Sequence, residues 1–519
     1  MPIEDPTVQE LRIIADRTYL HGVSDEWLGS MATIISRTLE AHRVIDELDD
    51  SRPTDVSDRD QGYAPQQEEN PHRGWVWKAS VEPTGTGILD GKSVAIKDNV
   101  QVAGLPMRVG TDMLAGFIPD EDATIVSRVL AAGGTVTGKS ACEYLSFSGS
   151  SFTTDTGAIL NPHDTTRSAG GSSSGAGALV ASGQVDIASG GDQSGSIRIP
   201  ASFCGVYGMK PSYGLVPATG VAPIENTVDH VGALAATVED LARFLDAVAG
   251  EDEEDPRQKV GWEAVSRPRL NGIFTDDLSG LRIGIVEESF AWDVSDPAVD
   301  AIVEGAALEF QQLGASVGRV SIPMHRIGMH INTAIQMEGA NTTMLRGNLA
   351  GSGWKGRYPR LLMEALGTAR AKHSTDMSDM MKELAILGEY LTDKFHGSYY
   401  AKAQNLAPQL TAAYSRAFEA YDLLLMPSTP MTATPLPGDD VSTEERFDYL
   451  LNMVNNTSPA CVTGHPSLSL PCGKSKDMPV GLMLTGRHWQ DATVLNAAHA
   501  FEQTRIYGDV VVKTPATAR

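Results

Sequence analysis

Two groups of serines in a glycine-rich stretch are the residues of this chain best suited to nucleophilic chemistry. Residues 168–200 read SAGGSSSGAGALVASGQVDIASGGDQSGSIRIP. Small residues permit close backbone approach, and GAGALVAS predicts a helix with serines at its positive N-terminal end. A strand at VDIAS then leads into a second tight turn. Such turns present a serine hydroxyl beside backbone N–H groups, which are the nucleophile and the oxyanion hole of an acyl-transfer site.

A serine nucleophile needs a base, and neither turn contains a histidine. Lysine can serve when burial removes its proton. Lys97, at the end of the apolar run VAIK, is the candidate for this role. The other interpretation of this local pattern is a lysine at a strand end whose side chain extends into solvent.

The composition describes an acidic folded protein and limits its partners. The chain has 519 residues and a formal net charge of −25, with 41% hydrophobic residues. This length suits two to three lobes, and the negative field makes nucleic acid an unexpected partner. We expect no membrane partner, because no apolar run approaches a bilayer-spanning length. The four cysteines form no CxxC pair and the N-terminus lacks a signal-peptide pattern, which favours a cytoplasmic location.

Alternating strand and helix patterns predict an α/β fold with a mixed β-sheet core covered by helices. The predicted parts are an N-terminal helical arm and linker (1–73), a core with the catalytic residues (74–280), a smaller helix-rich lobe lining substrate entry (281–425), and a C-terminal return to the core sheet (426–519). In the arm, Ser24 is expected to cap a helix with an apolar stripe at Leu28, Met31, Ile35, Leu39, Ile45 and Leu48. The arm either packs on its own domain or joins a second copy of the chain; we expect a homodimer through these helices.

Several segments, in order, resemble the amidase signature family. They are VAIKDNV, GKSACEYLSFSGSS, LNPHDTTRSAGGSS, the stretch GGSSSGAGALVASGQVDIASGGDQSGSIRIPASFCGVYGMKPS, DHVGALAATVEDLARFLDAVAG and NTSPACVTGHPSLSLPCG with PVGLMLTGRHWQD. The resemblance covers roughly residues 88–500. The N-terminal arm and the GGDQxGSIRIP motif resemble those of stand-alone bacterial amidases that act with nitrile hydratase. The family's fold is therefore the expected fold.

The resemblance implies a catalytic set of one lysine and two serines. Carried over by motif, the nucleophile is Ser196, the relay serine is Ser172, and the base is Lys97. It also implies that Ser172 lies in a cis peptide. The reaction it implies is hydrolysis of a small-molecule carboxamide to a carboxylic acid and ammonia or an amine, through an acyl-enzyme, without a metal or cofactor.

The resemblance also suggests which residues surround the reacting carbonyl. Backbone N–H groups of Gln193, Ser194, Gly195 and Ser196 are the expected oxyanion donors, and Ser194 departs from the glycine most common there. The acyl pocket is expected near Ser146 and Phe147, with parts of the Met-rich stretch from about 325 to 420. The aromatic side chain of residue 147 suggests an apolar or aryl acyl group.

Other interpretations remain open beside this one. The family includes the glutaminase component of the tRNA-dependent amidotransferase, and an aryl-acylamidase or urea-type hydrolase is a further alternative. GSSSG at 171–175 fits a nucleophile elbow with Ser173, and SGWK at 352–355 fits the S-x-x-K motif of penicillin-recognising enzymes. We interpret His163, His230 and His465 as structural histidines, and Asp192 with Arg198 as an ion pair that positions the turn.

Overall fold

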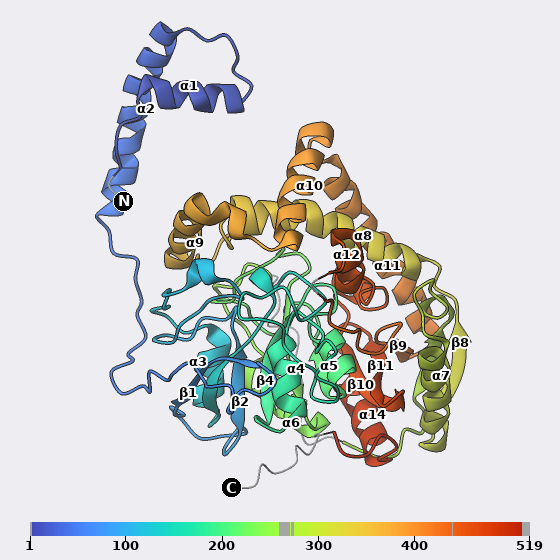
Figure 1. Cartoon of the computed structure of the whole chain (residues 1–519). Coiled ribbons are helices and arrows are strands. Elements are labelled where there is room, and N and C mark those ends of the chain that lie inside the picture. Colours follow the sequence, from blue (N-terminus) through green and yellow to red (C-terminus); the bar gives the residue numbers. More distant parts are fainter. Residues whose placement is uncertain (1–2, 259–269, 271–273, 439, 511–519) are drawn as a thin grey trace. The chain divides into compact units, whose positions relative to one another are not determined.

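The computed structural model describes residues 3–258, 270, 274–438 and 440–510. The chain divides into two compact units, Met1–Pro53 and Thr54–Arg519. Figure 1 shows the course of the chain through its elements. None of the described helices is both long and apolar enough to cross a membrane.

The first unit is a pair of helices, α1 (Val8–Arg17) and α2 (Asp25–Asp46). As predicted, the Ser24 hydroxyl caps α2 by accepting the backbone N–H of Trp27 at 3.2 Å. Leu11, Ala15 and Leu28 are buried between the helices. Toward the end of the predicted apolar stripe, Ile45 and Leu48 are 66% and 63% exposed, so α1 does not cover them. Two helices can cover only the part of α2 that lies opposite α1.

Within the described residues of the second unit, strands form an 11-stranded sheet in the order β1-β3-β2-β4-β6-β5-β10-β11-β9-β7-β8. Parallel pairs (β3–β2, β2–β4, β9–β7, β7–β8) flank a central antiparallel region, which confirms the predicted mixed sheet. The strand bounds are β1 Trp75–Val81, β2 Ser93–Lys97, β3 Thr135–Ser140, β4 Ile187–Asp192, β5 Tyr207–Lys210, β6 His230–Ala235, β7 Arg282–Val286, β8 Ser316–Val320, β9 Leu423–Pro427, β10 Ser467–Ser475 and β11 Met478–Gly486.

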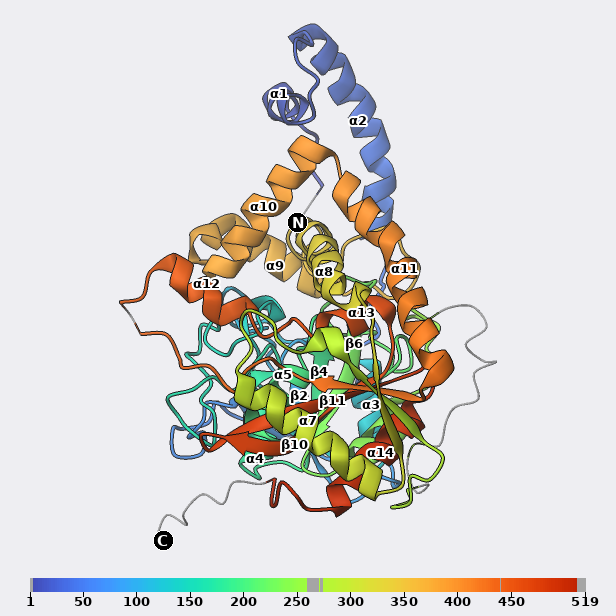
Figure 2. The ribbon, with the colours of Figure 1, turned by 90° about the vertical axis from the view of Figure 1, so that its right-hand side faces the viewer.

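Helices cover both faces of this sheet (Figures 1 and 2). The helix bounds are α3 Thr124–Ala131, α4 Ser174–Ala181, α5 Arg198–Cys204, α6 Val238–Val248, α7 Pro297–Gln312, α8 Met324–Ala340, α9 Arg360–His373, α10 Asp379–Phe395, α11 Ser398–Ala420, α12 Thr443–Leu451, α13 Ser458–Thr463 and α14 Asp491–Gln503. Short helical turns are η1 Asp112–Leu114, η2 Tyr144–Ser146, η4 Glu287–Ser289, the π-helical η5 Asn341–Arg346 and η6 Ser374–Asp376.

Side-chain alternation along β9 shows why the sheet is covered on both faces. Leu423 and Leu425 pack with side chains of α3, α6, α7 and α14 on one face. Leu424 and Met426 pack with α8 and α11 on the other. Successive strand residues point to opposite faces, so a strand that is apolar throughout needs two covers.

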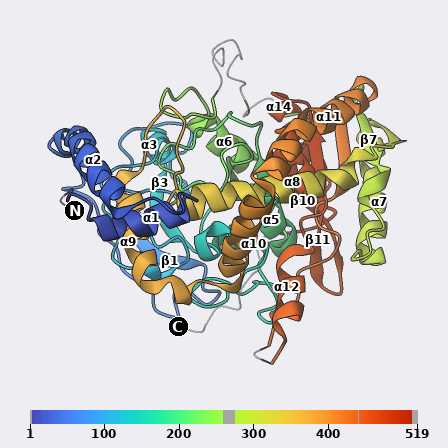
Figure 3. The ribbon, with the colours of Figure 1, turned by 90° about the horizontal axis from the view of Figure 1, so that it is seen from above.

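The predicted helix-rich stretch from about 325 to 420 forms α8 to α11. Figure 3 looks down on these helices, with α8 running across the molecule and α10 and α11 beside it. Strands β7 and β8 continue the same sheet as the core strands. The domain boundaries at 280 and 425 stay predictions.

Candidate active site

The turn between β4 and α5 is built around one buried carboxylate. Asp192 accepts the backbone N–H of Gly195 at 2.7 Å and that of Ile197 at 3.1 Å. It also pairs with the Arg198 guanidinium at 2.8 Å, with both side chains fully buried. Burial alone would raise the pKa of Asp192, but the Arg198 charge outweighs it and holds that pKa below its ordinary value. The predicted ion pair is confirmed, and it fixes the turn that carries Ser196.

Glycine is required at position 195 of this turn. Its φ is +136°, a conformation that side chains rarely adopt. A Cβ atom there would lie 2.3 Å from Thr457 Oγ1 and 2.7 Å from Ile199 Cδ1. The turn therefore packs so closely against the start of α13 that only hydrogen fits.

The first serine cluster meets the end of β2. The Lys97 ammonium nitrogen donates to Ser172 Oγ at 2.9 Å, and both side chains are fully buried. The backbone N–H of Lys97 donates to Ser189 Oγ at 2.9 Å, which fixes the strand end. The peptide bond between Gly171 and Ser172 is cis. The strand-end lysine thus points into the protein interior and not to water.

Burial lowers the pKa of Lys97 to about 8. The surrounding acidic groups act in the opposite direction, favouring the charged ammonium: Cys142, Asp192, Glu143 and Asp229. Burial dominates because an ammonium loses its hydration in the interior. A substantial fraction of Lys97 is therefore neutral at slightly alkaline pH.

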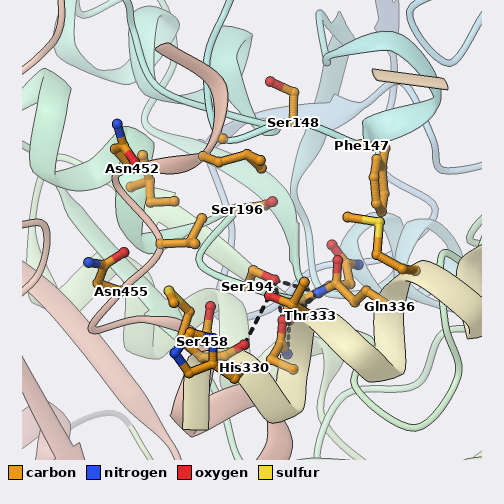
Figure 4. A pocket seen from close by; sticks show the side chains of 18 of the residues that line it. Phe147, Ser148, Ser194, Ser196, His330, Thr333, Gln336, Asn452, Asn455 and Ser458 are labelled. Carbon is orange, nitrogen blue, oxygen red and sulfur yellow. Dashed lines mark hydrogen bonds between the residues drawn. The ribbon is translucent and has the colours of Figure 1, made fainter. Parts of the chain in front are cut away.

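The two turns lie side by side. The backbone N–H of Ser173 donates to the carbonyl oxygen of Ser196 at 3.2 Å. Ser196 lines a cavity of about 670 Å³, whereas Lys97 and Ser172 are outside that lining. Figure 4 shows Ser196 in this cavity with Ser194, Phe147 and Ser148 around it. The arrangement places one serine at the cavity and a buried lysine–serine pair next to its backbone.

One predicted oxyanion donor needs correction. The N–H of Gly195 is occupied by Asp192, so it is not free to bind a substrate oxygen. Within the described part of the chain, the backbone N–H groups of Gln193, Ser194 and Ser196 have no hydrogen-bond partner. These three N–H groups are the ones left for an oxyanion.

The cavity wall is mostly apolar and includes the predicted pocket residues Ser146 and Phe147. Met-rich helices contribute to it, as expected from the sequence. Its apolar side chains are Phe147, Ile199, Ile224, Trp292, Val294, Met329, Met337, Met380, Leu451 and Val454.

A single strongly basic side chain lies among the described residues of this wall. Arg326 donates to the carbonyl oxygens of Glu288 and Phe290 at 3.0 and 2.8 Å. Its guanidinium also lies over the Trp292 ring, 4.6 Å from the centroid. Arg326 is therefore engaged by the protein itself.

Three residues that contact the Ser196 turn were not identified from the sequence: Asn332, Gln336 and Thr457. Asn332 and Gln336 lie four residues apart on α8, a spacing that places two polar side chains on one helix face. That spacing was the available signal, but it does not indicate which distant segment the pair contacts.

The alternative nucleophiles lie outside the cavity lining. Ser173 is fully buried, and its hydroxyl donates to the Gly191 carbonyl at 3.4 Å. Ser352 and Lys355 of the SGWK segment are exposed. The three histidines each bond a nearby oxygen, with partners Cys204 O for His163, Val228 O for His230 and Thr463 Oγ1 for His465. Among the described residues, no group of three or more His, Cys, Asp or Glu could hold a metal ion.

Comparison with known proteins gives the family. The family model described as Amidase matches residues 77–495. The chain is 41% identical over 487 residues to an enantioselective amidase of Rhodococcus rhodochrous, which covers 93% of each protein. It is 33% identical over 429 residues to a glutamyl-tRNA(Gln) amidotransferase component of Methanosarcina mazei, covering 81% of this chain and 86% of that protein.

Solved structures agree with this assignment. The native peptide amidase of Stenotrophomonas maltophilia matches with a TM-score of 0.67 and 28% identity, covering 82% of this chain and 85% of that chain. The corresponding glutamyl-tRNA(Gln) amidotransferase component of Thermotoga maritima matches with a TM-score of 0.70 and 27% identity, covering 86% and 92%. The cavity with Ser196 and the buried Lys97–Ser172 pair thus belong to a shared fold, and the chain is a member of the amidase signature family.

Proposed function

We propose that this protein hydrolyses a carboxamide C–N bond, with Ser196 as nucleophile, Ser172 as relay and Lys97 as base. The observation that carries the proposal is the 2.9 Å hydrogen bond from Lys97 to Ser172, directly beside a serine that opens into the cavity. The family and the enantioselective and peptide amidases that resemble this chain support the same reaction.

The proposed acylation begins with neutral Lys97. Its nitrogen takes the Ser172 hydroxyl proton while Ser172 takes the proton of Ser196, and Ser196 Oγ adds to the amide carbonyl carbon. The carbonyl oxygen becomes an oxyanion held by the N–H groups of Gln193, Ser194 and Ser196. The relay then returns the proton to the leaving nitrogen, and the C–N bond breaks to give an acyl-enzyme.

Deacylation uses the same relay, with water as the nucleophile and the Ser196 oxygen as the leaving group. A water molecule gives one proton to the relay and adds its oxygen to the ester carbonyl. The second tetrahedral intermediate collapses, the Ser196 oxygen regains a proton, and the carboxylic acid leaves. Lys97 is neutral at the start and at the end of the cycle.

We propose an uncharged, apolar or aryl acyl group as the preferred substrate portion. The apolar wall supports it, and Asp293 is the acidic residue among the described lining. A glutamine substrate carries a carboxylate, which is best bound by a free guanidinium. Arg326 is engaged by backbone carbonyls and Trp292, which favours uncharged amides over glutamine as substrates.

A panel of purified amides tests this function. Benzamide, 2-phenylpropionamide, acetamide, glutamine, an anilide and urea would each be incubated with the protein, and released ammonia or amine measured. We expect the aryl and arylalkyl primary amides to be turned over with the highest kcat/KM. Turnover of glutamine above all other substrates would support the glutaminase role in a tRNA-dependent amidotransferase. Exclusive cleavage of the anilide or of urea would support an aryl-acylamidase or urea-type hydrolase.

We also propose a cytoplasmic homodimer joined through the N-terminal helices. All four cysteines are buried and free, as suits a reducing compartment. Apolar side chains that the arm's own helices leave exposed could bury themselves against a second copy, among them Ile13, Ile14, Leu20, Ile45 and Leu48.

A further inference from the structure

Two amide side chains on α8 hold the turn that carries the proposed oxyanion donors. Asn332 Nδ2 and Gln336 Nε2 both donate to the carbonyl oxygen of Gln193, at 3.0 and 2.9 Å. Both side chains are buried. A single backbone carbonyl therefore receives two hydrogen bonds from one face of one helix.

The Ser194 hydroxyl closes this group of contacts. It donates to Asn332 Oδ1 at 2.6 Å and also accepts from Gln336 Nε2. Gln336 Nε2 lies 2.9 Å from Asn332 Oδ1 as well. Figure 4 shows the Ser194 and Gln336 side chains meeting at the cavity wall. Serine, in contrast to glycine, gives the turn a side chain that reaches α8.

Through the geometry of the peptide unit, the contact of the Gln193 carbonyl with α8 determines where the Ser194 N–H points. The carbonyl of Gln193 and the N–H of Ser194 belong to one planar trans unit and point in opposite directions. Fixing that carbonyl against α8 therefore fixes the direction of the Ser194 N–H. The next peptide unit is fixed in the same way, because Thr457 Oγ1 donates to the Ser194 carbonyl and Gly195 N–H donates to Asp192.

The same helix forms part of the cavity wall. Met329, Thr333 and Met337 of α8 line the cavity together with Asn332 and Gln336. A substrate that packs on α8 therefore contacts the helix that sets the orientation of the turn. Cavity-lining side chains and the contacts that hold the oxyanion turn thus lie on the same helix.

We propose that Asn332, Gln336 and the Ser194 hydroxyl form an amide clamp that orients the Ser194 N–H toward the substrate oxyanion. The inference rests on the proposed function, since it assigns positioning residues to the same site. The clamp residues act through the backbone of the turn and take no proton in the reaction. Their effect is on transition-state binding and not on substrate capture.

The test compares Asn332→Ala with Asn341→Ala. Asn341 is equally buried, follows α8 directly, and donates to Glu389 at 3.0 Å without lining the cavity. Each variant thus loses one buried amide of this helical segment, but only the first loses the clamp. Thermal unfolding of both variants would show whether their structural costs match.

We expect Asn332→Ala to lower kcat on the best primary amide by roughly 10- to 100-fold with KM changed less than about threefold, because loss of a whole oxyanion donor costs about 10² to 10³. Asn341→Ala should stay within about threefold of wild type. Phenylboronic acid, whose adduct with a serine is tetrahedral, should lose affinity for Asn332→Ala in parallel with kcat. Benzoate, a trigonal product analogue, should bind as before.

Ser194→Ala provides a second variant on a partly exposed turn and keeps the test open if Asn332→Ala fails to fold. Its kcat should fall as well, and the Ser194→Ala/Asn332→Ala double variant should lose clearly less than the product of the two single losses. Equal kcat for Asn332→Ala and Asn341→Ala, an unchanged kcat for Ser194→Ala, or independent losses in the double variant would overturn the clamp in an active enzyme. Wild-type protein that neither hydrolyses amides nor binds phenylboronic acid would instead overturn the proposed function itself.

Discussion

The Lys97 ammonium nitrogen lies 2.9 Å from the Ser172 hydroxyl oxygen, and neither side chain is exposed to solvent. This contact joins the end of β2 to the turn before α4, two segments 75 residues apart. Burial of Lys97 outweighs the surrounding acidic groups that favour its charged form, and this lowers its pKa to about 8. The pair is therefore suited to hold and release a proton beside Ser196.

The first prediction concerns pH. Since burial lowers the pKa of Lys97 to about 8, the base is protonated and inactive below that pH and neutral above it. We expect kcat/KM to rise about tenfold per pH unit on the acidic side and to level off above pH 8. Initial rates between pH 6 and 10, with stability checked at each pH, measure this. A pH-independent rate from pH 6 upward would argue against Lys97 as the base.

Replacing the base separates its chemistry from its charge. Lys97→Arg keeps a cation that cannot lose its proton, and Lys97→Met keeps an unbranched buried chain. Both should lower kcat by roughly 10³-fold, near the usual range for general bases. Lys210→Met is the matched control, because Lys210 is also fully buried with a lowered pKa of about 8 but donates to the carbonyl oxygens of Pro211 and His465. An equal loss of kcat in Lys210→Met would mean that removing any buried lysine lowers kcat, and that a role of Lys97 as base is not needed to explain its loss.

The tight turn gives a steric prediction. Gly195→Ala would place Cβ 2.3 Å from Thr457 Oγ1 and should lower kcat by about 10²-fold or more by displacing the oxyanion donors. Gly250→Ala is the control, since Gly250 has the same φ of +136° but faces only the end of the Arg128 side chain at 3.2 Å. Melting temperature and kcat of the two variants distinguish backbone strain from damage to the site. An active Gly195→Ala enzyme would contradict the packing described for this turn.

Substrate preference should depend on Phe147. Its buried ring lines the cavity, so Phe147→Ala should remove roughly 1–3 kcal/mol of apolar contact from an aryl acyl group. We expect kcat/KM for benzamide to fall about 10- to 100-fold, while acetamide changes little. Acetamide serves as the internal control for folding and for the catalytic groups. Parallel losses for both substrates would place the acyl group elsewhere in the cavity.

Oligomeric state depends on the arm in our proposal. Replacing the exposed Ile45 and Leu48 by glutamate should weaken self-association without touching the core of α1 and α2. Light scattering should show a dimer for the wild type and a shift toward monomer for the variant, with amidase activity as the check on folding. An unchanged molar mass would exclude this face as the interface.

Much of the sheet and both serine turns could be predicted from sequence because their signals are local. The run VAIK is short and apolar and becomes β2, and GAGALVAS becomes α4 within a residue or two. The resemblance supplied what local patterns could not, namely that Lys97 and Ser172 belong together. Phe147 lies in the cavity wall, as the placement of its segment suggested.

The rest could not be predicted because it depends on contacts between distant segments. Asp192 takes the N–H of Gly195, so one of the expected oxyanion donors is already used. Asn332 meets the Gln193 carbonyl across 139 residues of sequence, and no local pattern encodes that contact. Ile45 and Leu48 are exposed because α1 is too short to cover this end of the arm.

Trapping of the acyl-enzyme tests the central claim most directly. The protein would be mixed with its best amide, quenched in acid within milliseconds to seconds, and digested for peptide mass mapping, with Ser196→Ala, Ser172→Ala and Ser173→Ala in parallel. We predict an acyl group on Ser196 in wild type and in Ser173→Ala, no acyl group and no turnover in Ser196→Ala, and strongly slowed acylation in Ser172→Ala. Acylation at another serine, or substantial turnover by Ser196→Ala, would contradict the assignment of Ser196 as nucleophile.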